Sequence, residues 1–265
     1  MADVRRPTHF FSGYVFDLDG TVYLGDAALP GAREVIAAVR GRGARVVFLS
    51  NNPLRTRAQY AGKLTSLGIA TRPEDVINSS CVLVEYLQRR APGRALFVVG
   101  EDSVKGELRA AGFRFSETPQ EIDLVVACFD RTFDYRKLQV AFDAIRAGAG
   151  FIATNLDAYC PVPGGGLPDC GAIVAAIEAC TGKRVEAVMG KPSPIMGAVI
   201  LEKLGLPPAQ CVIVGDRLET DMALGHAVGI HTALVLTGAT ARARLAAWAT
   251  PPEFVLERLA DLLPG

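Results

Sequence analysis

The chain has 265 residues, of which 50% are apolar and 21% charged, an ordinary composition for a globular protein with room for two domains. Its 28 basic and 28 acidic residues balance to a net charge of zero, and no apolar run approaches the roughly 18 residues that a membrane span needs. These numbers argue against nucleic acids and membranes as partners.

Strand and helix patterns alternate along almost the whole chain. The predicted strands cover residues 13–18, 45–49, 95–99, 123–127, 150–153, 211–215 and 231–236. The predicted helices between them include residues 31–41, 54–67, 134–147, 171–181, 194–204 and 218–227. Near-continuous apolar strands that alternate with helices are typical of parallel sheets covered on both faces, so the predicted fold class is α/β.

The first predicted strand ends in two acids, Asp17 and Asp19, separated by Leu18. Alternation along a strand places both acids on one side, with their Cα atoms roughly 6–7 Å apart. At an effective dielectric constant near 20, the two carboxylates would repel each other by about 2–3 kcal/mol. Gly20 then turns the chain. A fold that needed only a core would not place two acids there, so they indicate a functional site.

Polar side chains of reactive types also flank three later elements. They are Ser50 and Asn51 after the strand at 45–49, Lys191 before the helix at 194–204, and Asp216 and Asp221 after the strand at 211–215. Ligands of parallel α/β sheets bind at the carboxyl ends of the strands. The pattern therefore predicts that these side chains share one site with the two acids of the first strand.

The reactive loops are confined to the first fifth and the last third of the chain, whereas the strands in the middle end in less reactive residues. This distribution predicts one catalytic domain, formed by residues 1–80 and 185–265. Residues 81–184 are predicted to form a second α/β domain inserted into it.

The predicted site combines four acids with a single lysine, Lys191, which favours the binding of a divalent cation. Mg²⁺ takes oxygen ligands and is usually held by one or two carboxylates and a phosphate. Ser50 and the backbone amides beside it, ahead of the helix expected after Pro53, form a candidate anion site. The lysine adds a charge suited to phosphate. A cation and an anion site facing a carboxylate suit phosphoryl transfer through an aspartyl-phosphate.

Four short segments carry a resemblance to a known family. The segments DLDGT, SNN, GKP and GDRLETD occur in this order and resemble the four motifs of the haloacid dehalogenase superfamily. The insertion between the second and third motifs, and the run GDRLETDMALGHAVGIHTALVLTG, resemble its class IIA phosphatases, which act on sugar, nitrophenyl and vitamin B6 phosphates. The resemblance covers nearly the whole chain. It implies a doubly wound, Rossmann-like core with an α/β cap inserted between the second and third motifs.

The resemblance assigns catalytic and metal-binding roles to four acids. Asp17 is expected to be the nucleophile, and Asp19 to protonate the leaving alcohol and then deprotonate the attacking water. Mg²⁺ is expected to bind the Asp17 carboxylate, the Asp19 backbone carbonyl and Asp216, with Asp221 in the outer coordination sphere.

The same resemblance assigns Ser50, Asn51 and Lys191 to the phosphoryl oxygens, whose charge they would offset in the transition state. The expected activity is the hydrolysis of small phosphate monoesters. A phospho-aspartate receiver is a non-enzymatic alternative, because receivers also use an aspartate, Mg²⁺ and a lysine. Receivers have about half this length and lack an acid two residues after the acceptor, so Asp19 and the insertion argue against it.

Residues 155–171, NLDAYCPVPGGGLPDCG, are predicted to form a loop beside the site. Similar vitamin B6 phosphatases carry a histidine before a proline in this loop, whereas Cys160 stands there in this chain. A thiol does not replace both the donor and the acceptor of imidazole. We therefore expect Asp157, Tyr159 and Cys160 to face the leaving group of a small sugar or polyol phosphate, with pyridoxal phosphate and nucleoside monophosphates as alternatives.

The six cysteines are scattered, without a C-x-x-C pair or nearby histidine pairs. This pattern predicts free thiols in a reducing compartment rather than disulfides or zinc. The first residues contain no long apolar stretch, so no secretory signal is expected. A cytoplasmic location is therefore predicted, and a homodimer is left open.

Overall fold

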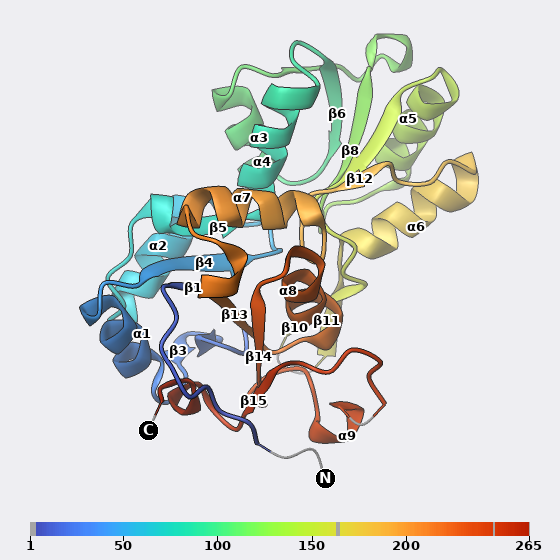
Figure 1. Ribbon diagram of the computed structural model, residues 1–265. Helices are drawn as coiled ribbons and strands as arrows, with labels where there is room; N and C mark the ends of the chain where they lie inside the picture. Colours follow the sequence, from blue (N-terminus) through green and yellow to red (C-terminus); the bar gives the residue numbers. More distant parts are fainter. Residues whose placement is uncertain (1–3, 163–164, 246, 265) are drawn as a thin grey trace. The chain divides into compact units, whose positions relative to one another are not determined.

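The computed structural model describes residues 4–162, 165–245 and 247–264, which form two compact units (Figure 1). Unit 1 comprises residues 1–50, 57–77 and 191–265, and unit 2 comprises residues 51–56 and 78–190. Each unit contains a parallel β-sheet with helices packed against it, which confirms the predicted α/β class. Within the described residues, every helix is too short or too polar to cross a bilayer.

Unit 1 is built on a six-stranded sheet. In spatial order its strands are β15 (Phe254–Leu256), β14 (His231–Val235), β13 (Cys211–Gly215), β1 (Gly13–Asp17), β4 (Arg45–Ser50) and β5 (Val76–Asn78). The pairs from β15 through to β4 are parallel. The chain passes from β1 to β4 on one side, and β13 lies on the other side of β1. The sheet therefore has its topological switch point beside β1, where ligands of such sheets bind.

The helical segments of unit 1 include one turn of π-helix. They are α1 (Ala32–Gly41), α2 (Arg57–Ser66), η1 (Pro73–Asp75), α7 (Pro194–Leu204), η3 (Pro208–Gln210), the π turn η4 (Leu218–Met222), α8 (Ala223–Val228), α9 (Arg242–Leu245) and η5 (Leu259–Leu262). A short antiparallel hairpin, β2 (Tyr23–Leu24) and β3 (Ala27–Ala28), follows β1.

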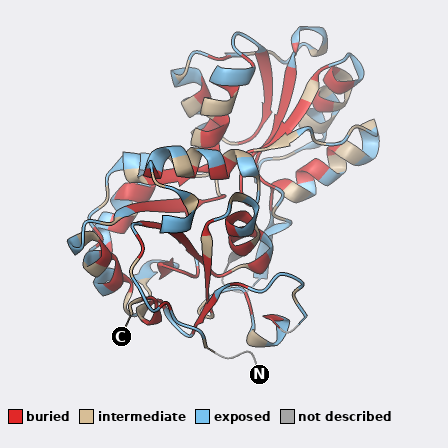
Figure 2. Ribbon diagram, viewed as in Figure 1, coloured by how far each residue is buried: buried red, intermediate tan, exposed pale blue. Residues whose placement is uncertain are grey.

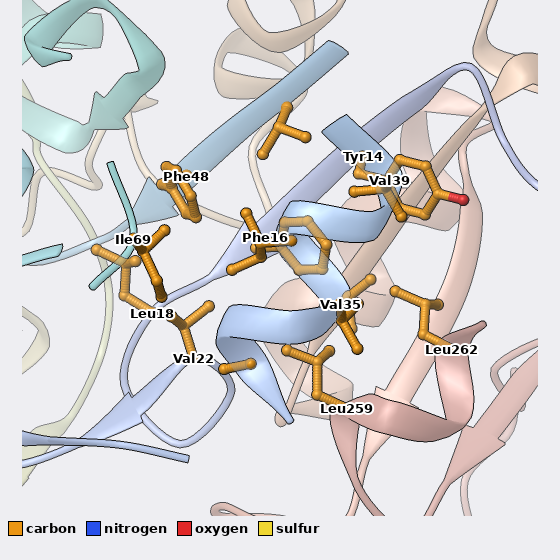
Figure 3. Close-up of a cluster of buried hydrophobic side chains, with 14 of the residues drawn as sticks. Tyr14, Phe16, Leu18, Val22, Val35, Val39, Phe48, Ile69, Leu259 and Leu262 are labelled. Atoms are coloured by element: carbon orange, nitrogen blue, oxygen red, sulfur yellow. The ribbon is translucent and has the colours of Figure 1, made fainter. Parts of the chain in front are cut away.

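Alternation along the strands of unit 1 sorts side chains onto the two faces of the sheet. Tyr14 and Phe16 of β1 belong to one buried cluster with Phe48 of β4 and with Val35 and Val39 of α1 (Figure 3). The rings of Tyr14 and Phe16 stack with centroids 5.9 Å apart. All of β1 is buried, as the red strands in Figure 2 show, because helices cover both faces of the sheet. Its sequence is accordingly continuous in apolar residues up to the acid at its end.

Unit 2 contains a five-stranded parallel sheet and a separate hairpin. The sheet order is β12 (Ala187–Val188), β9 (Gly150–Ala153), β8 (Leu124–Ala127), β6 (Ala95–Val99) and β7 (Arg114–Phe115). The hairpin pairs β10 (Tyr159–Val162) with β11 (Gly165–Pro168). The helical segments are α3 (Ser79–Arg90), α4 (Asp102–Ala110), η2 (Pro119–Glu121), α5 (Tyr135–Arg146) and α6 (Cys170–Thr181). Apolar residues of α5 and α6 pack on one face of the sheet.

Every strand predicted from the sequence is present within one residue of its expected ends. For the helix predicted at 54–67, however, the predicted start lies three residues before the observed one. The side-chain oxygen of Asn52 accepts a hydrogen bond from the Leu54 amide at 2.8 Å, which closes a local turn. The helix α2 consequently begins at Arg57. The helix start expected after Pro53 is therefore wrong.

The segment predicted as a loop at 155–171 contains the hairpin β10–β11 instead. Two of its prolines lie within the paired strands. Proline has no backbone N–H, but a strand of a two-stranded ribbon pairs on one side only, so a missing donor is tolerated there better than in a central strand. The sequence also places Gly205 and Gly229 directly after apolar helix patterns, which predicts that the two helices end there. The structure confirms this, since these glycines end α7 and α8 with φ angles of 56° and 73°.

Candidate active site

The carboxyl end of β1 carries a buried ion-pair cluster. The ammonium nitrogen of Lys191 lies 2.5 Å from Oδ1 of Asp17 and 2.6 Å from Oδ1 of Asp221. The lysine side chain is only 5% exposed. Three parts of the chain that are far apart in sequence therefore meet at one point of unit 1.

A third acid completes a group of carboxylates. One oxygen from each of Asp17, Asp216 and Asp221 lies within 4.8 Å of the others, and all three residues are buried. Three carboxylates against one ammonium leave an excess of negative charge. A donor set made of oxygens alone, with this excess, fits a hard divalent cation.

The pKa values of the cluster are shifted because the carboxylates are buried close to one another. Burial raises the pKa of Asp17 well above its usual range; Lys191 opposes this shift, and Asp221 and Asp216 add to it. Burial also raises the pKa of Asp216 to about 6, reinforced by Asp221. Burial would lower the pKa of Lys191, but the two carboxylates it contacts outweigh this effect and raise it. The lysine is therefore a cation at neutral pH.

Two glycines allow the acids to approach so closely. A Cβ atom on Gly238 would lie 2.0 Å from Oδ2 of Asp216, and one on Gly215 would lie 2.3 Å from Cβ of Asp221. The space next to Gly238 lets Asp216 accept a hydrogen bond from the Ala239 amide at 2.6 Å. Sequence reasoning missed Gly238 and Ala239, because nothing in their local pattern indicates that they pack on an acid from another strand.

Asp221 lies in the π turn η4 at the start of the helix predicted at 218–227. Its Oδ2 atom accepts a hydrogen bond from the Arg217 amide at 3.2 Å. Single π turns are frequent at functional sites, because the widened turn changes the direction of a side chain. Here the turn holds Asp221 against Lys191.

Asp19 has a different environment from Asp17. The strand β1 ends at Asp17, one residue earlier than predicted, and Asp19 is exposed in the turn that follows. That turn is fixed by the Leu18 carbonyl, which accepts from the Val22 amide at 2.9 Å. The hydroxyl of the buried Tyr23 donates to Oδ2 of Asp19 at 3.4 Å. Sequence reasoning did not single out Tyr23, which reads as an ordinary apolar position after the motif.

Ser50 lies at the same edge of the sheet as the carboxylates. It ends β4, and the parallel register pairs Asp17 with Leu49, the residue before it. Its hydroxyl donates to the Tyr60 hydroxyl at 3.1 Å. The structure thus brings Asp17, Ser50, Lys191, Asp216 and Asp221 to one edge of unit 1.

The other predicted site residues belong to unit 2. The side-chain nitrogen of Asn51 donates to Oδ2 of Asp157 at 3.1 Å. Tyr159 and Cys160 lie on β10, and Tyr159 is 58% exposed. The ring of Tyr159 covers Gly166 on the paired strand, where a Cβ atom would lie 2.7 Å from the ring.

Comparisons with known proteins agree with the motifs. A family model described as haloacid dehalogenase-like hydrolase matches residues 14–114, and a second model, for HAD-like hydrolases, matches residues 188–262. The chain is 36% identical to the sugar-phosphatase AraL of Bacillus subtilis, over 95% of this chain and 92% of that protein. It is 35% identical to human chronophin, over 96% and 92%.

A solved structure, the 4-nitrophenylphosphatase of Thermotoga maritima, aligns with a TM-score of 0.90 and 37% identity over 95% of each chain. The order of the motifs, the Rossmann-like sheet and these relatives all agree. The chain therefore belongs to the haloacid dehalogenase-like hydrolases, within their class IIA phosphatases.

Proposed function

We propose that this phosphoric monoester hydrolase is a Mg²⁺-dependent enzyme that cleaves small phosphate esters through an aspartyl-phosphate. The observation that carries the proposal is the buried cluster in which Lys191 contacts both Asp17 and Asp221 next to a third carboxylate. Relatives named sugar-phosphatase, acid sugar phosphatase and nitrophenylphosphatase support small esters as substrates.

In the first half-reaction, a carboxylate oxygen of Asp17 attacks phosphorus while the bond to the ester oxygen breaks. Asp19 donates its proton to the departing oxygen, so the products are an alcohol and an acyl phosphate on Asp17. In the second half-reaction, the Asp19 carboxylate takes a proton from water as that water attacks phosphorus. Inorganic phosphate leaves, and the Asp17 carboxylate and the Asp19 acid are regenerated.

The phosphoryl oxygens are bound by Ser50, Asn51 and Lys191. The hydrogen-bond donors of all three residues and the positive charge of the lysine stabilise the transition state. The Asp17 and Asp216 carboxylates and the Asp19 backbone carbonyl would hold Mg²⁺, with Asp221 outside them. When bound, the ion supplies positive charge that offsets the repulsion between the nucleophile and the phosphate.

The substrate is proposed to be a sugar or polyol phosphate, with pyridoxal phosphate and nucleoside monophosphates as the alternatives. Residues 81–184 are proposed to form the specificity domain. All six cysteines lie within the described residues and none of them forms a disulfide there, which supports a reducing, cytoplasmic location. A screen of phosphate release over sugar, polyol, nucleotide and vitamin B6 phosphates tests the substrate class.

The exposed acid Asp19 gives a first prediction. Asp19→Asn should lower kcat by about 10²–10⁴-fold, because an amide neither donates a proton to the leaving oxygen nor accepts one from water. The loss should be larger for sugar phosphates than for nitrophenyl phosphate, whose leaving group needs less protonation. Steady-state kinetics on both esters measure the difference. A variant with unchanged kcat on sugar phosphates would remove Asp19 from the mechanism.

The hairpin β10–β11 gives a second prediction. Replacing Tyr159 and Cys160 by alanine should change the ratio of kcat/KM values among esters without changing Mg²⁺ affinity. Tyr135→Ala is a matched control, because Tyr135 is also an exposed tyrosine of unit 2, 79% exposed at the start of α5. If the wild-type enzyme hydrolysed pyridoxal phosphate better than all other esters by a wide margin, the proposed role of Cys160 would be contradicted.

A further inference from the structure

We propose that Asp157 is a positioning residue, which fixes the side-chain amide of Asn51 for phosphate binding and does not select among esters. The inference rests on the proposed role of Asn51 at the phosphoryl group. It differs from the expectation that Asp157 faces the leaving group.

Asn51 is held by hydrogen bonds to both its side chain and its backbone. Its side-chain nitrogen donates to Oδ2 of Asp157 at 3.1 Å. Its carbonyl oxygen accepts from the hydroxyl of Ser79 at 2.6 Å and from the side-chain nitrogen of Asn155 at 3.2 Å. Ser79 and Asn155 are fully buried. The residue that follows Ser50 in the chain is therefore tied to unit 2 at several atoms.

The backbone of Asp157, which carries this carboxylate, is held by hydrogen bonds on both sides of the residue. Its backbone amide donates to the side-chain oxygen of Asn155 at 3.0 Å, and its carbonyl oxygen accepts from the Gly171 amide at 2.9 Å. A Cβ atom on Gly171 would lie 2.8 Å from that carbonyl oxygen, so glycine allows the start of α6 to pack against the loop. The carboxylate that accepts from Asn51 thus belongs to a loop whose backbone is held by hydrogen bonds and by packing against the start of α6.

This arrangement determines which way the Asn51 amide points. A carboxylate only accepts hydrogen bonds, so it binds the amide nitrogen and repels the amide oxygen. The amide oxygen is directed to Gly190, where a Cβ atom would lie 2.7 Å from it. A phosphoryl oxygen also only accepts. A flipped amide would present its oxygen to the phosphate, and Asp157 prevents that flip.

The role predicts a uniform loss of phosphate binding. Asp157→Ala should weaken the binding of inorganic phosphate in the presence of Mg²⁺ by about tenfold, measured by calorimetry. It should lower kcat/KM for nitrophenyl, sugar and polyol phosphates by a similar factor, leaving their ratios unchanged. Asp157→Asn should keep most of the phosphate affinity, because its side-chain oxygen still accepts the hydrogen bond.

A matched control is Asp143→Ala on α5, because Asp143 is also a carboxylate of unit 2 that accepts from a side-chain amide, that of Gln139 at 3.1 Å. It should change neither phosphate affinity nor selectivity. Three outcomes would each overturn the positioning role. Asp157→Ala could leave the phosphate affinity unchanged, it could alter the ratios of kcat/KM among esters, or it could lose as much phosphate affinity as Asp157→Asn does. Failure of the wild type to hydrolyse any ester would instead overturn the proposed function, since phosphate binding is read without turnover.

Discussion

Asp17→Asn should abolish phosphatase activity, with a loss of at least about 10⁴-fold in kcat, because an amide does not attack phosphorus. The side-chain oxygen of asparagine still accepts a hydrogen bond from Lys191, which Asp17 contacts at 2.5 Å. The substitution also removes one of three crowded negative charges. The variant should therefore remain folded, and the loss should be purely chemical.

Two measurements separate the nucleophile from a structural role for Asp17. The thermal midpoint of Asp17→Asn should be no lower than that of the metal-free wild type, because burial penalises the charged form of this carboxyl and raises its pKa. Wild-type enzyme quenched in acid during turnover should carry an acyl phosphate that the variant lacks. A variant that keeps a rate near that of the wild type would place the nucleophile elsewhere.

Removal of divalent metal should lower activity at least about 10³-fold, and added Mg²⁺ should restore it. The physical reason is the buried group formed by Asp17, Asp216 and Asp221, whose oxygens lie within 4.8 Å of one another with one lysine to offset them. A bound cation stabilises the folded state by mass action, so Mg²⁺ should also raise the thermal midpoint of the metal-free protein by several degrees. Hydrolysis that continues unchanged in EDTA would contradict the metal assignment.

The pH dependence of stability provides an independent check on this charge excess. The pKa of Asp216 is raised to about 6 in the folded protein, above its unfolded value, so ionisation of this group destabilises the fold. The metal-free protein should therefore gain stability as the pH falls from 7 toward 5. Asp216→Asn should lack this part of the gain, and Mg²⁺ should reduce it in the wild type. Equal pH dependence in the variant and the wild type would contradict the crowding at Asp216.

The sequence by itself determined the fold class, the positions of the main strands, and the grouping of Lys191 with the three acids around it. Buried parallel strands are continuous apolar runs, so segments such as β1 and β13 are visible without any tertiary information. The glycines that end α7 and α8 were visible for a similar reason, since a left-handed backbone at a helix end depends on local geometry.

Other features depended on neighbours distant in the chain. Lys191 and Asp17 are 174 positions apart, and no local pattern encodes their contact. The π turn at Asp221, the late start of α2 at Arg57 and the hairpin β10–β11 also departed from the local reading. At α2 the competing interaction is the turn closed by the Asn52 side chain, which displaces the helix start that propensity favoured.

The hydrogen bond between Asn51 and Asp157 shows this limit most clearly. The sequence indicated both residues as functional, but for separate tasks, because each lies at the end of a different strand. The tertiary structure brings the amide of Asn51 to the carboxylate of Asp157, 106 positions away in the chain. A hydrogen bond depends on distance and direction in space, and only the folded chain fixes both.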